Sequence, residues 1–231
     1  MNTLNTLIRP SAPRVRRTTR AFTLIELLTV IAIIGILASI LIPTVAKVRD
    51  TARQSVCGSN IRQITLAMLM FANDNEGMLP GGGSQSSPRD DDWIHWQPAR
   101  EFRDSGIAGY IGEDFNEALF RCPSDTNYAE FNYPYSYTIN TELTAAPYNN
   151  PTPRGDFIMG GIDRLDTPTR MIMFIEEADF AARNDAVVFL AGRDKLTRRH
   201  GERGNVSFAD GHVRTVSPEF VRDPINSSPG Y

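Results

Sequence analysis

An uninterrupted apolar run from Phe22 to Ile42 limits the folds open to this chain more than any other segment, and its only charged residue is Glu26. As an α-helix, about 21 residues rise roughly 30 Å, which matches the hydrocarbon thickness of a bilayer. A helix that is apolar on every side is not stable on the surface of a water-soluble domain. The run therefore predicts a membrane-spanning helix that anchors the rest of the chain.

The leader before this helix, residues 1–21, carries five arginines and no acidic residue. Positive charge beside a span stays on the cytoplasmic side, so we expect a cytoplasmic N-terminus and a translocated C-terminal part. A conventional cleaved signal peptide is the competing interpretation, but the apolar run is longer than the usual 7–15 residues of such a peptide. Removing five positive charges from a net charge of −3 leaves −8, which gives no electrostatic reason to expect a nucleic-acid partner.

Helical spacing continues beyond the apolar run. Apolar residues recur at intervals of three to five, at Val45, Val48, Ala52, Val56, Ile61, Ile64, Met68 and Phe71. This spacing predicts an amphipathic continuation of the helix over residues 43–76, with Pro43 and Gly58 as places where it can bend. Gly77 can adopt the left-handed conformation that ends a helix, and Pro80 prevents its continuation.

The remaining segment, residues 77–231, predicts one extracytoplasmic, β-rich domain. Strands are expected at 171–176, 186–191, 205–209 and 212–216. Asp210-Gly211 lies between the last two strands and favours a tight hairpin turn, with Val206 and Phe208 on the core face. One long helix followed by a mainly antiparallel sheet is an α+β arrangement.

The segment RAFTLIE at residues 20–26 resembles the processing site of type IV pilins and type II secretion pseudopilins. This resemblance implies that a prepilin peptidase cuts between Ala21 and Phe22, that the new amine of Phe22 is N-methylated, and that Glu26 is needed for filament assembly. The family usually has glycine where this chain has Ala21. Pro43 lies where many pilins carry a proline, and the fold implied is pilin-like.

A second resemblance concerns the rest of the chain. His200 and Asp210-Gly211 form an H-x9-DG element at 200–211, and this element, the segment 57–80 and FRCPSD at 120–125 are similar to a large bacterial group of pseudopilin-like proteins. The group implies pilin-like architecture rather than a molecular task. In a structural interpretation, Asp210 and Gly211 make the turn and His200 hydrogen-bonds the hairpin.

The sequence offers no cofactor site and no catalytic residues, because nucleophile-elbow, HExxH and paired-carboxylate signatures are missing. His200, Asp210 and His212 are therefore expected to be structural. Cys57 and Cys122 lie outside metal-ligand spacings, so no metal site is expected. An oxidising compartment would permit a disulfide between them, but spacing does not give the required Cα separation, so both states stay open. No EF-hand loop pattern is present, which leaves calcium binding undecided.

Two functions fit these features, and neither is enzymatic. The first is a structural subunit of a type II secretion pseudopilus or type IV pilus-like filament, anchored in the bacterial inner membrane with its C-terminal domain in the periplasm. Its partners would be the prepilin peptidase/methyltransferase, other pilin-like subunits, the inner-membrane assembly machinery and membrane lipid. The alternative is a membrane-anchored envelope protein that binds a glycan or other extracellular ligand through the loop containing Trp93 and Trp96. The two tryptophans themselves are better explained as caps of the core, because aromatic side chains bury a large area.

The mature chain is expected to start at Phe22, because the basic leader, Ala21 and the FTLIE run together match a prepilin site. Mass analysis of the N-terminal peptide of protein from its native host should find an N-methylated Phe22. A mature chain that starts after Ile42 would contradict the anchor.

Overall fold

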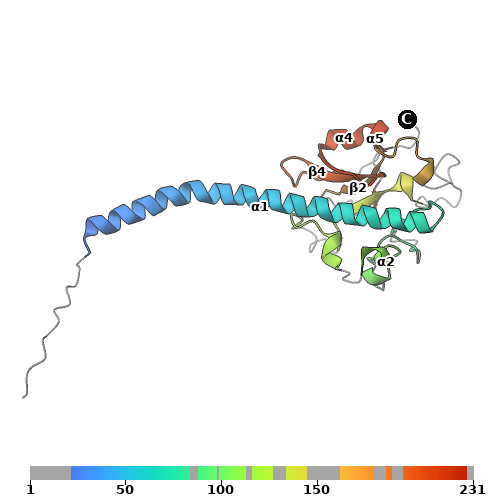
Figure 1. Ribbon diagram of the computed structural model, residues 1–231, viewed down its shortest axis with the longest axis horizontal. Helices are drawn as coiled ribbons and strands as arrows, with labels where there is room; N and C mark the ends of the chain where they lie inside the picture. The colour runs from blue at the N-terminus through green and yellow to red at the C-terminus, as the bar shows by residue number, and fades with distance from the viewer. Residues whose placement is uncertain are drawn as a thin grey trace, which may run out of the picture. The chain divides into compact units, whose positions relative to one another are not determined.

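The computed structural model of this protein describes residues 22–83, 88–97, 99–112, 116–126, 134–144, 162–178, 186–188 and 195–227. The chain divides into two units, residues 1–45 and 46–231. Helix α1, Leu24–Asp74, contributes its first part to one unit and its second part to the other (Figure 1). A long helix followed by a small sheet gives the α+β, pilin-like fold that the sequence predicts.

Helix α1 is continuous over 51 residues, with Pro43 inside it. Beyond its last turn, Gly77 has a φ of 81° and its N–H donates to the carbonyl of Ala72 at 2.8 Å. This left-handed residue satisfies one of the carbonyls that a helix end leaves without a partner. The predicted end of the helix is confirmed.

The second part of α1 supplies one wall of the core of residues 46–231. The buried apolar side chains of the helix are Cys57, Ile61, Ile64, Ala67, Met68 and Ala72. The predicted apolar stripe is therefore correct from Ile61 onward. Farther upstream Val45, Val48 and Val56 are exposed, because residues of α1 become buried only from Cys57.

Five strands form one sheet in the order β3-β1-β2-β4-β5. Their bounds are β1 Tyr137–Asn140, β2 Ile172–Glu176, β3 Val187–Val188, β4 Gly204–Phe208 and β5 Val213–Val216. Neighbours pair antiparallel except β1 and β3, which are parallel. Residues 189–191 of the strand expected at 186–191 lie outside the described residues.

Short helices complete the domain. The α-helices are α2 Ala108–Ile111, α4 Pro218–Arg222 and α5 Pro224–Ser227. The 3₁₀ helices are η1 Phe102–Asp104, η2 Glu117–Phe120, η3 Thr141–Leu143 and η4 Ile162–Arg164.

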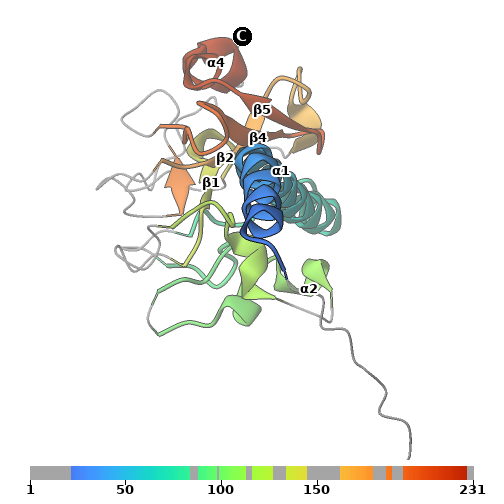
Figure 2. The same cartoon turned by 90° about the vertical axis from the view of Figure 1, so that its left-hand side faces the viewer.

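Both faces of the sheet bury apolar side chains. Figure 2 shows the β4–β5 hairpin between α1 and α4. Val206 and Phe208 are buried in the cluster that includes Val221 of α4, as predicted for the core face of their strand. A register shift between Ile172 and Phe174 breaks the alternation of β2, so that adjacent Met173 and Phe174 both belong to the cluster lined by α1.

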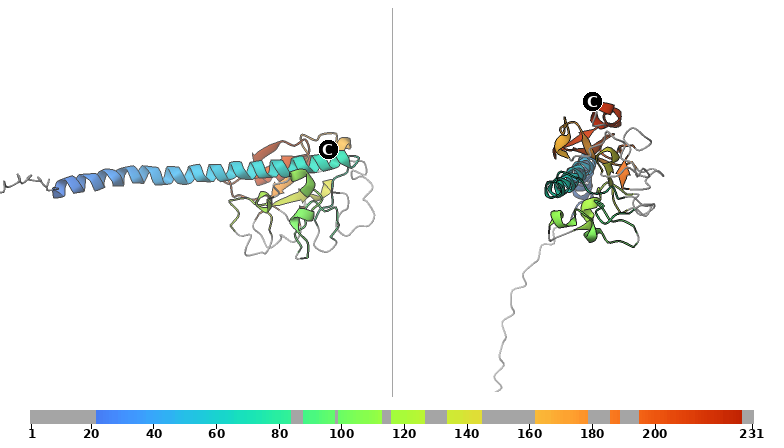
Figure 3. Two further views of the ribbon diagram at one scale, coloured as in Figure 1. Left: turned by 60° about the horizontal axis from the view of Figure 1, so that its bottom comes forward. Right: turned by 90° about the vertical axis from the view of Figure 1, so that its right-hand side faces the viewer.

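Polar contacts fix the hairpin to α1, which lies along the sheet in Figure 3. The hydroxyl oxygens of Thr65 and Ser207 lie 2.7 Å apart in the core. Nearer the membrane-anchoring part of the helix, Gln54 Nε2 donates to Thr215 Oγ1 at 3.0 Å. These bonds set the position of the hairpin along the helix.

Gly211 ends the predicted hairpin turn with a φ of 90°, a conformation that costs a residue with a side chain about 1–2 kcal/mol. A Cβ there would also lie 3.3 Å from Leu69 Cδ1. We expect Gly211→Ala to lower the free energy of unfolding by about 1–2 kcal/mol. Denaturant unfolding of the full chain in detergent, followed by tryptophan fluorescence, measures the change.

Gly109→Ala is the matched control, since a Cβ at Gly109 meets no atom within 4 Å and its φ is not positive. Equal stability of Gly211→Ala and the unchanged chain would contradict this description of the turn.

Candidate functional site

The first candidate site is the N-terminus of α1, where Thr23 and Glu26 bond each other. Glu26 Oε2 accepts hydrogen bonds from the N–H and the hydroxyl of Thr23, both at 2.8 Å, and the N–H of Glu26 donates to Thr23 Oγ1 at 3.2 Å. This reciprocal pattern is a capping box, in which two orphan N–H groups of a helix end find partners. This cap is not among the features predicted from the sequence, although the T-x-x-E spacing of residues 23–26 is its signature.

The helix that follows this cap exposes its apolar side chains. Within residues 22–45, the largest exposed fractions include 87% for Leu24, 73% for Ile25 and 70% for Ile42. Among the described residues, α1 is the helix long and apolar enough to cross a membrane, and its most apolar stretch is not buried within the chain. Exposed apolar surface of this extent fits membrane anchoring.

A second candidate site is a polar network inside residues 46–231, built around a disulfide between Cys57 and Cys122. The bond joins α1 to the segment after η2, across a sequence separation of 65 residues. Closing a loop of this length stabilises the folded state by about 4 kcal/mol in the chain-entropy model. The N–H of Cys122 donates to Ser136 Oγ at 3.1 Å, so the network continues to the residue before β1.

Glu176 and His200 lie against this disulfide. His200 Nε2 is 3.0 Å from Glu176 Oε1 and 3.5 Å from Cys122 Sγ, and the side chains of the His–Glu pair are 1% and 0% exposed. The other carboxylate oxygen of Glu176 accepts the N–H of Asn205 at 2.6 Å. Glu176 is the last residue of β2, so the end of a central strand sets its position.

The backbone turn at residues 200–203 holds His200 in place. Gly201 and Glu202 have φ values of 61° and 65°, and the N–H of His200 donates to the carbonyl of Arg203 at 3.0 Å. Two successive positive φ values are typical of a type I′ turn. The side chain of the non-glycine Glu202 forms an exposed ion pair with Arg198 at 2.9 Å.

Buried charges lie next to the same network. Arg199 Nη2 is 3.2 Å from Asp125 Oδ2, and both side chains are less than a tenth exposed. Burial lowers the pKa of the Arg199 guanidinium, while the charges of Asp125 and Glu176 oppose that shift. Burial also raises the pKa of Tyr137 well above its usual 10, and the charge of Glu176 acts in the same direction.

The structure separates the H-x9-DG residues into two places. Asp210 and Gly211 lie in the β4–β5 turn, where Asp210 Oδ1 accepts the N–H of His212 at 3.1 Å. The side chain of His200 bonds Glu176 on β2, rather than the hairpin as expected. Sequence reasoning missed Glu176 because it lies 24 positions from His200 and belongs to no recognisable motif.

Trp93 and Trp96 are buried in the core, as the area of aromatic side chains predicts, so this pair gives no support to the ligand-binding alternative. Trp93 is 0% exposed, lies with its ring centroid 4.9 Å from that of Phe174, and donates its Nε1 hydrogen to the carbonyl of Gly82 at 3.0 Å. Trp96 is 9% exposed and donates to the carbonyl of Gly83 at 2.7 Å. Both rings are buried because their apolar area stabilises the core and their N–H groups find carbonyls.

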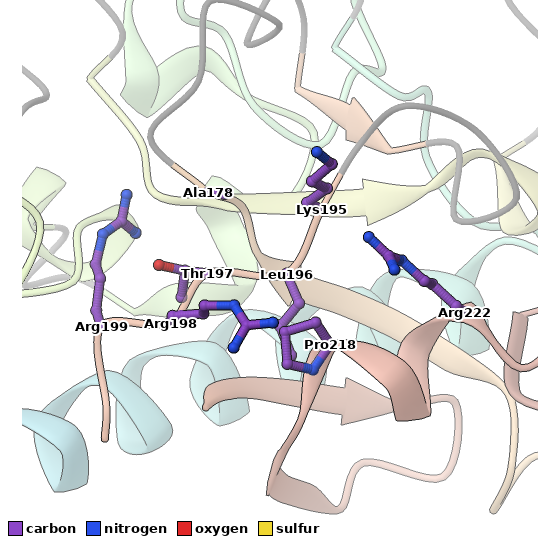
Figure 4. A pocket seen from close by; sticks show the side chains of 8 residues that line it. All are labelled: Ala178, Lys195, Leu196, Thr197, Arg198, Arg199, Pro218 and Arg222. Carbon is purple, nitrogen blue, oxygen red and sulfur yellow. The ribbon is translucent and has the colours of Figure 1, made fainter. Parts of the chain in front are cut away.

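A basic pocket of about 480 Å³ lies beside the network, as Figure 4 shows. Its lining residues are Ala178, Lys195, Leu196, Thr197, Arg198, Arg199, Pro218 and Arg222. Arg198 is paired with Glu202 and with Glu219, the latter at 3.4 Å, and Arg199 is paired with Asp125. The positive charges of Arg198 and Arg199 in this pocket are therefore already balanced by carboxylates of the same chain.

Comparison with known proteins bears on the N-terminal segment. Residues 16–42 match the family model described as a prokaryotic N-terminal methylation motif. Over 60 residues the chain is 40% identical to the type II secretion system core protein G of Pseudomonas aeruginosa, covering 26% of this chain and 42% of that protein. Over 57 residues it is 42% identical to the type IV major pilin protein PilA of Myxococcus xanthus, covering 25% and 26%.

The chain thus matches less than half the length of each of these relatives. No solved structure matches it significantly.

The buried pair of Arg199 and Asp125 predicts a stability effect. Asp125→Ala leaves the Arg199 charge buried without its carboxylate, so we expect the free energy of unfolding to fall by about 3–5 kcal/mol. Glu202→Ala removes the exposed partner of the neighbouring Arg198 and should change it by less than about 1 kcal/mol. Denaturant unfolding in detergent compares the two variants, and similar effects would contradict the burial argument.

Proposed function

We propose that this chain, whose N-terminal segment is similar to those of a type II secretion core protein and a type IV pilin, is processed to a membrane-anchored structural subunit of a filament, either a type II secretion pseudopilus or a type IV pilus-like polymer. The observation that carries this proposal is the exposed apolar helix that follows residue 21. Its first turn contains the Thr23–Glu26 capping box and lies within the matched motif. The genes that neighbour this one bear on the proposal. A nearby outer-membrane secretin and assembly ATPase would favour a filament subunit, of either kind, over a simple membrane anchor.

Under this proposal the chain has four segments. Residues 1–21 are a leader that the prepilin peptidase removes, and residues 22–42 span the inner membrane. Residues 43–76 continue the helix into the periplasm, and residues 77–231 form the periplasmic domain. Five arginines in the leader support a cytoplasmic N-terminus through the positive-inside bias.

The exposed apolar helix supports assembly because it needs an apolar environment wherever the subunit is. In the membrane that environment is lipid, and in a filament it is the helices of neighbouring subunits. Exchanging lipid for protein gains little hydrophobic free energy, since lipid tails are as apolar as leucine. Polar groups in the helix are then well suited to set which position an incoming subunit takes.

Glu26 is the residue best placed for this role. Its carboxylate already has hydrogen bonds from Thr23, which offset part of the unfavourable burial of a charge in an apolar setting. Cleavage after Ala21 creates a positive amine on Phe22, one residue before the cap. We propose that Glu26 pairs with this amine, in its own chain or in a neighbour, and that pairing between chains fixes the axial register.

Two substitutions separate charge from capping at this site. Glu26→Gln keeps an acceptor for Thr23, since glutamine also serves in a capping box, but removes the charge. We expect Glu26→Gln and Glu26→Val to insert and lose the leader normally but to be missing from filaments. Co-expression with the assembly machinery, followed by shearing and by crosslinking, measures the polymer.

Thr23→Val is the matched control, because it removes the capping hydroxyl and keeps the Glu26 charge. It should assemble better than Glu26→Gln. Normal polymer from processed Glu26→Val would defeat the proposed role, and normal polymer from Glu26→Gln alone would assign the role to capping.

A further inference from the structure

Four side chains with metal-binding atoms converge inside residues 46–231, and they include both sulfurs of the disulfide. Cys57, Cys122, Glu176 and His200 each offer one ligand atom, and these four atoms lie within 4.8 Å of one another. All four residues are buried. They come from α1, the segment after η2, the end of β2 and the turn at 200–203, so four separate parts of the scaffold hold them together.

The donor set suits a tetrahedral zinc site once the disulfide is reduced. Zinc takes thiolate sulfur at about 2.3 Å, and imidazole nitrogen and carboxylate oxygen at about 2.0–2.2 Å. Ligand atoms at the corners of such a tetrahedron lie roughly 3.4–3.8 Å apart. His200 Nε2 is 3.5 Å from Cys122 Sγ and 3.0 Å from Glu176 Oε1, so these two distances need to change little. The two sulfurs are bonded to each other and must move apart after reduction for both to bind the ion.

Glu176 has the surroundings of a ligating carboxylate. The oxygen that does not face His200 accepts the N–H of Asn205 at 2.6 Å, and an outer hydrogen bond of this kind orients a metal ligand. A disulfide alone requires neither a carboxylate nor an imidazole beside its sulfurs. Burying such an ionisable pair is unfavourable unless its partners offset the lost hydration.

We propose that the dithiol form of this chain binds one Zn²⁺ ion through Cys57, Cys122, Glu176 and His200, and that the zinc form and the disulfide form are alternative states of one site. The thiols of the reduced chain release two protons as they bind the ion as thiolates. Two thiolates and a carboxylate exceed the charge of the ion by one, so the zinc-bound site carries a net charge of −1, while the neighbouring buried pair of Arg199 and Asp125 is neutral.

The exchange between the two states balances as a thiol–disulfide reaction. A disulfide-bearing oxidant accepts two electrons from the thiolates, its own S–S bond breaks to give two thiolates, and the Cys57–Cys122 bond forms as Zn²⁺ leaves. A disulfide sulfur no longer has the thiolate charge that holds the metal. In the oxidised domain the covalent bond joins α1 to the segment after η2, and in the reduced domain the ion joins them.

Co²⁺ and Zn²⁺ test this with the full chain in detergent. The chain is reduced by a phosphine in denaturant, the phosphine is removed, and the chain is refolded without oxygen with or without metal. We expect one equivalent of Co²⁺ to bind, with the intense visible absorption of tetrahedral cobalt and a thiolate-to-cobalt band, and Zn²⁺ to displace it. The oxidised chain should give neither band.

The proposal also makes refolding depend on the metal, because binding free energy adds to folding free energy when the site forms only in the folded state. Circular dichroism and thiol titration should find a folded, reduced chain with Zn²⁺ bound. A folded chain with two free thiols and no metal, or a reduced chain that fails to refold when Zn²⁺ is present, would overturn the proposal.

Substitution of the non-sulfur ligands identifies the site. We expect Glu176→Gln and His200→Asn to weaken Zn²⁺ binding to the reduced chain by at least about 100-fold, in competition with a chromophoric chelator. His212→Asn is the matched control, since His212 also contacts a carboxylate, that of Asp210, but lies at the exposed turn, and it should bind as tightly as the unchanged chain. Unchanged Zn²⁺ affinity in both ligand variants would show adventitious binding by the two thiols and would overturn the proposed site. If a variant does not fold, the Co²⁺ spectrum of the unchanged chain decides whether a tetrahedral thiolate site exists.

Discussion

One helix must satisfy two different environments, and the rest of this structure follows from that requirement. The first part of α1 exposes apolar side chains around its circumference, so it needs lipid or other helices. From Cys57 onward the same helix buries one face, including Ile61, Ile64 and Met68, in the core of residues 46–231. The domain is therefore built on the second part of a helix that it does not enclose.

A domain with few regular elements needs other means to hold its loops. The strands contain between two and five residues, so ladder hydrogen bonds alone fix little of the chain. The disulfide, the Glu176–His200 pair and the Arg199–Asp125 pair join the helix, the sheet and the loops in one buried network. Because each partner would be costly to leave alone in the core, the network also specifies a single arrangement.

The local parts of this structure could be predicted from the sequence. The end of α1 at Gly77 and the turn at Asp210-Gly211 depend on residues within a few positions, and both have the predicted positive φ. The apolar period also gave Ile61, Ile64 and Met68 correctly. Periodicity marks an apolar face but does not say where the domain that covers it begins, so the start of burial at Cys57 could not be predicted.

The long-range parts could not be predicted. Glu176 and His200 are 24 residues apart, and no single sequence says that β2 ends beside the turn at 200–203. The tryptophan pair is different, because the area that aromatic side chains bury already favours the core, and the packing of Trp93 on Phe174 confirms that prediction. The Thr23–Glu26 cap, in contrast, is a local feature that the T-x-x-E spacing of residues 23–26 indicates.

The filament proposal is tested most directly by asking whether this chain polymerises. The measurement is electron microscopy of filaments sheared from cells that make the chain together with its own prepilin peptidase and assembly machinery, with an antibody against residues 195–227 carrying gold. The proposal predicts filaments labelled along their length or at their tips and containing the chain processed at Phe22. Processed chain that stays entirely in the membrane fraction, beside unlabelled filaments, would contradict it.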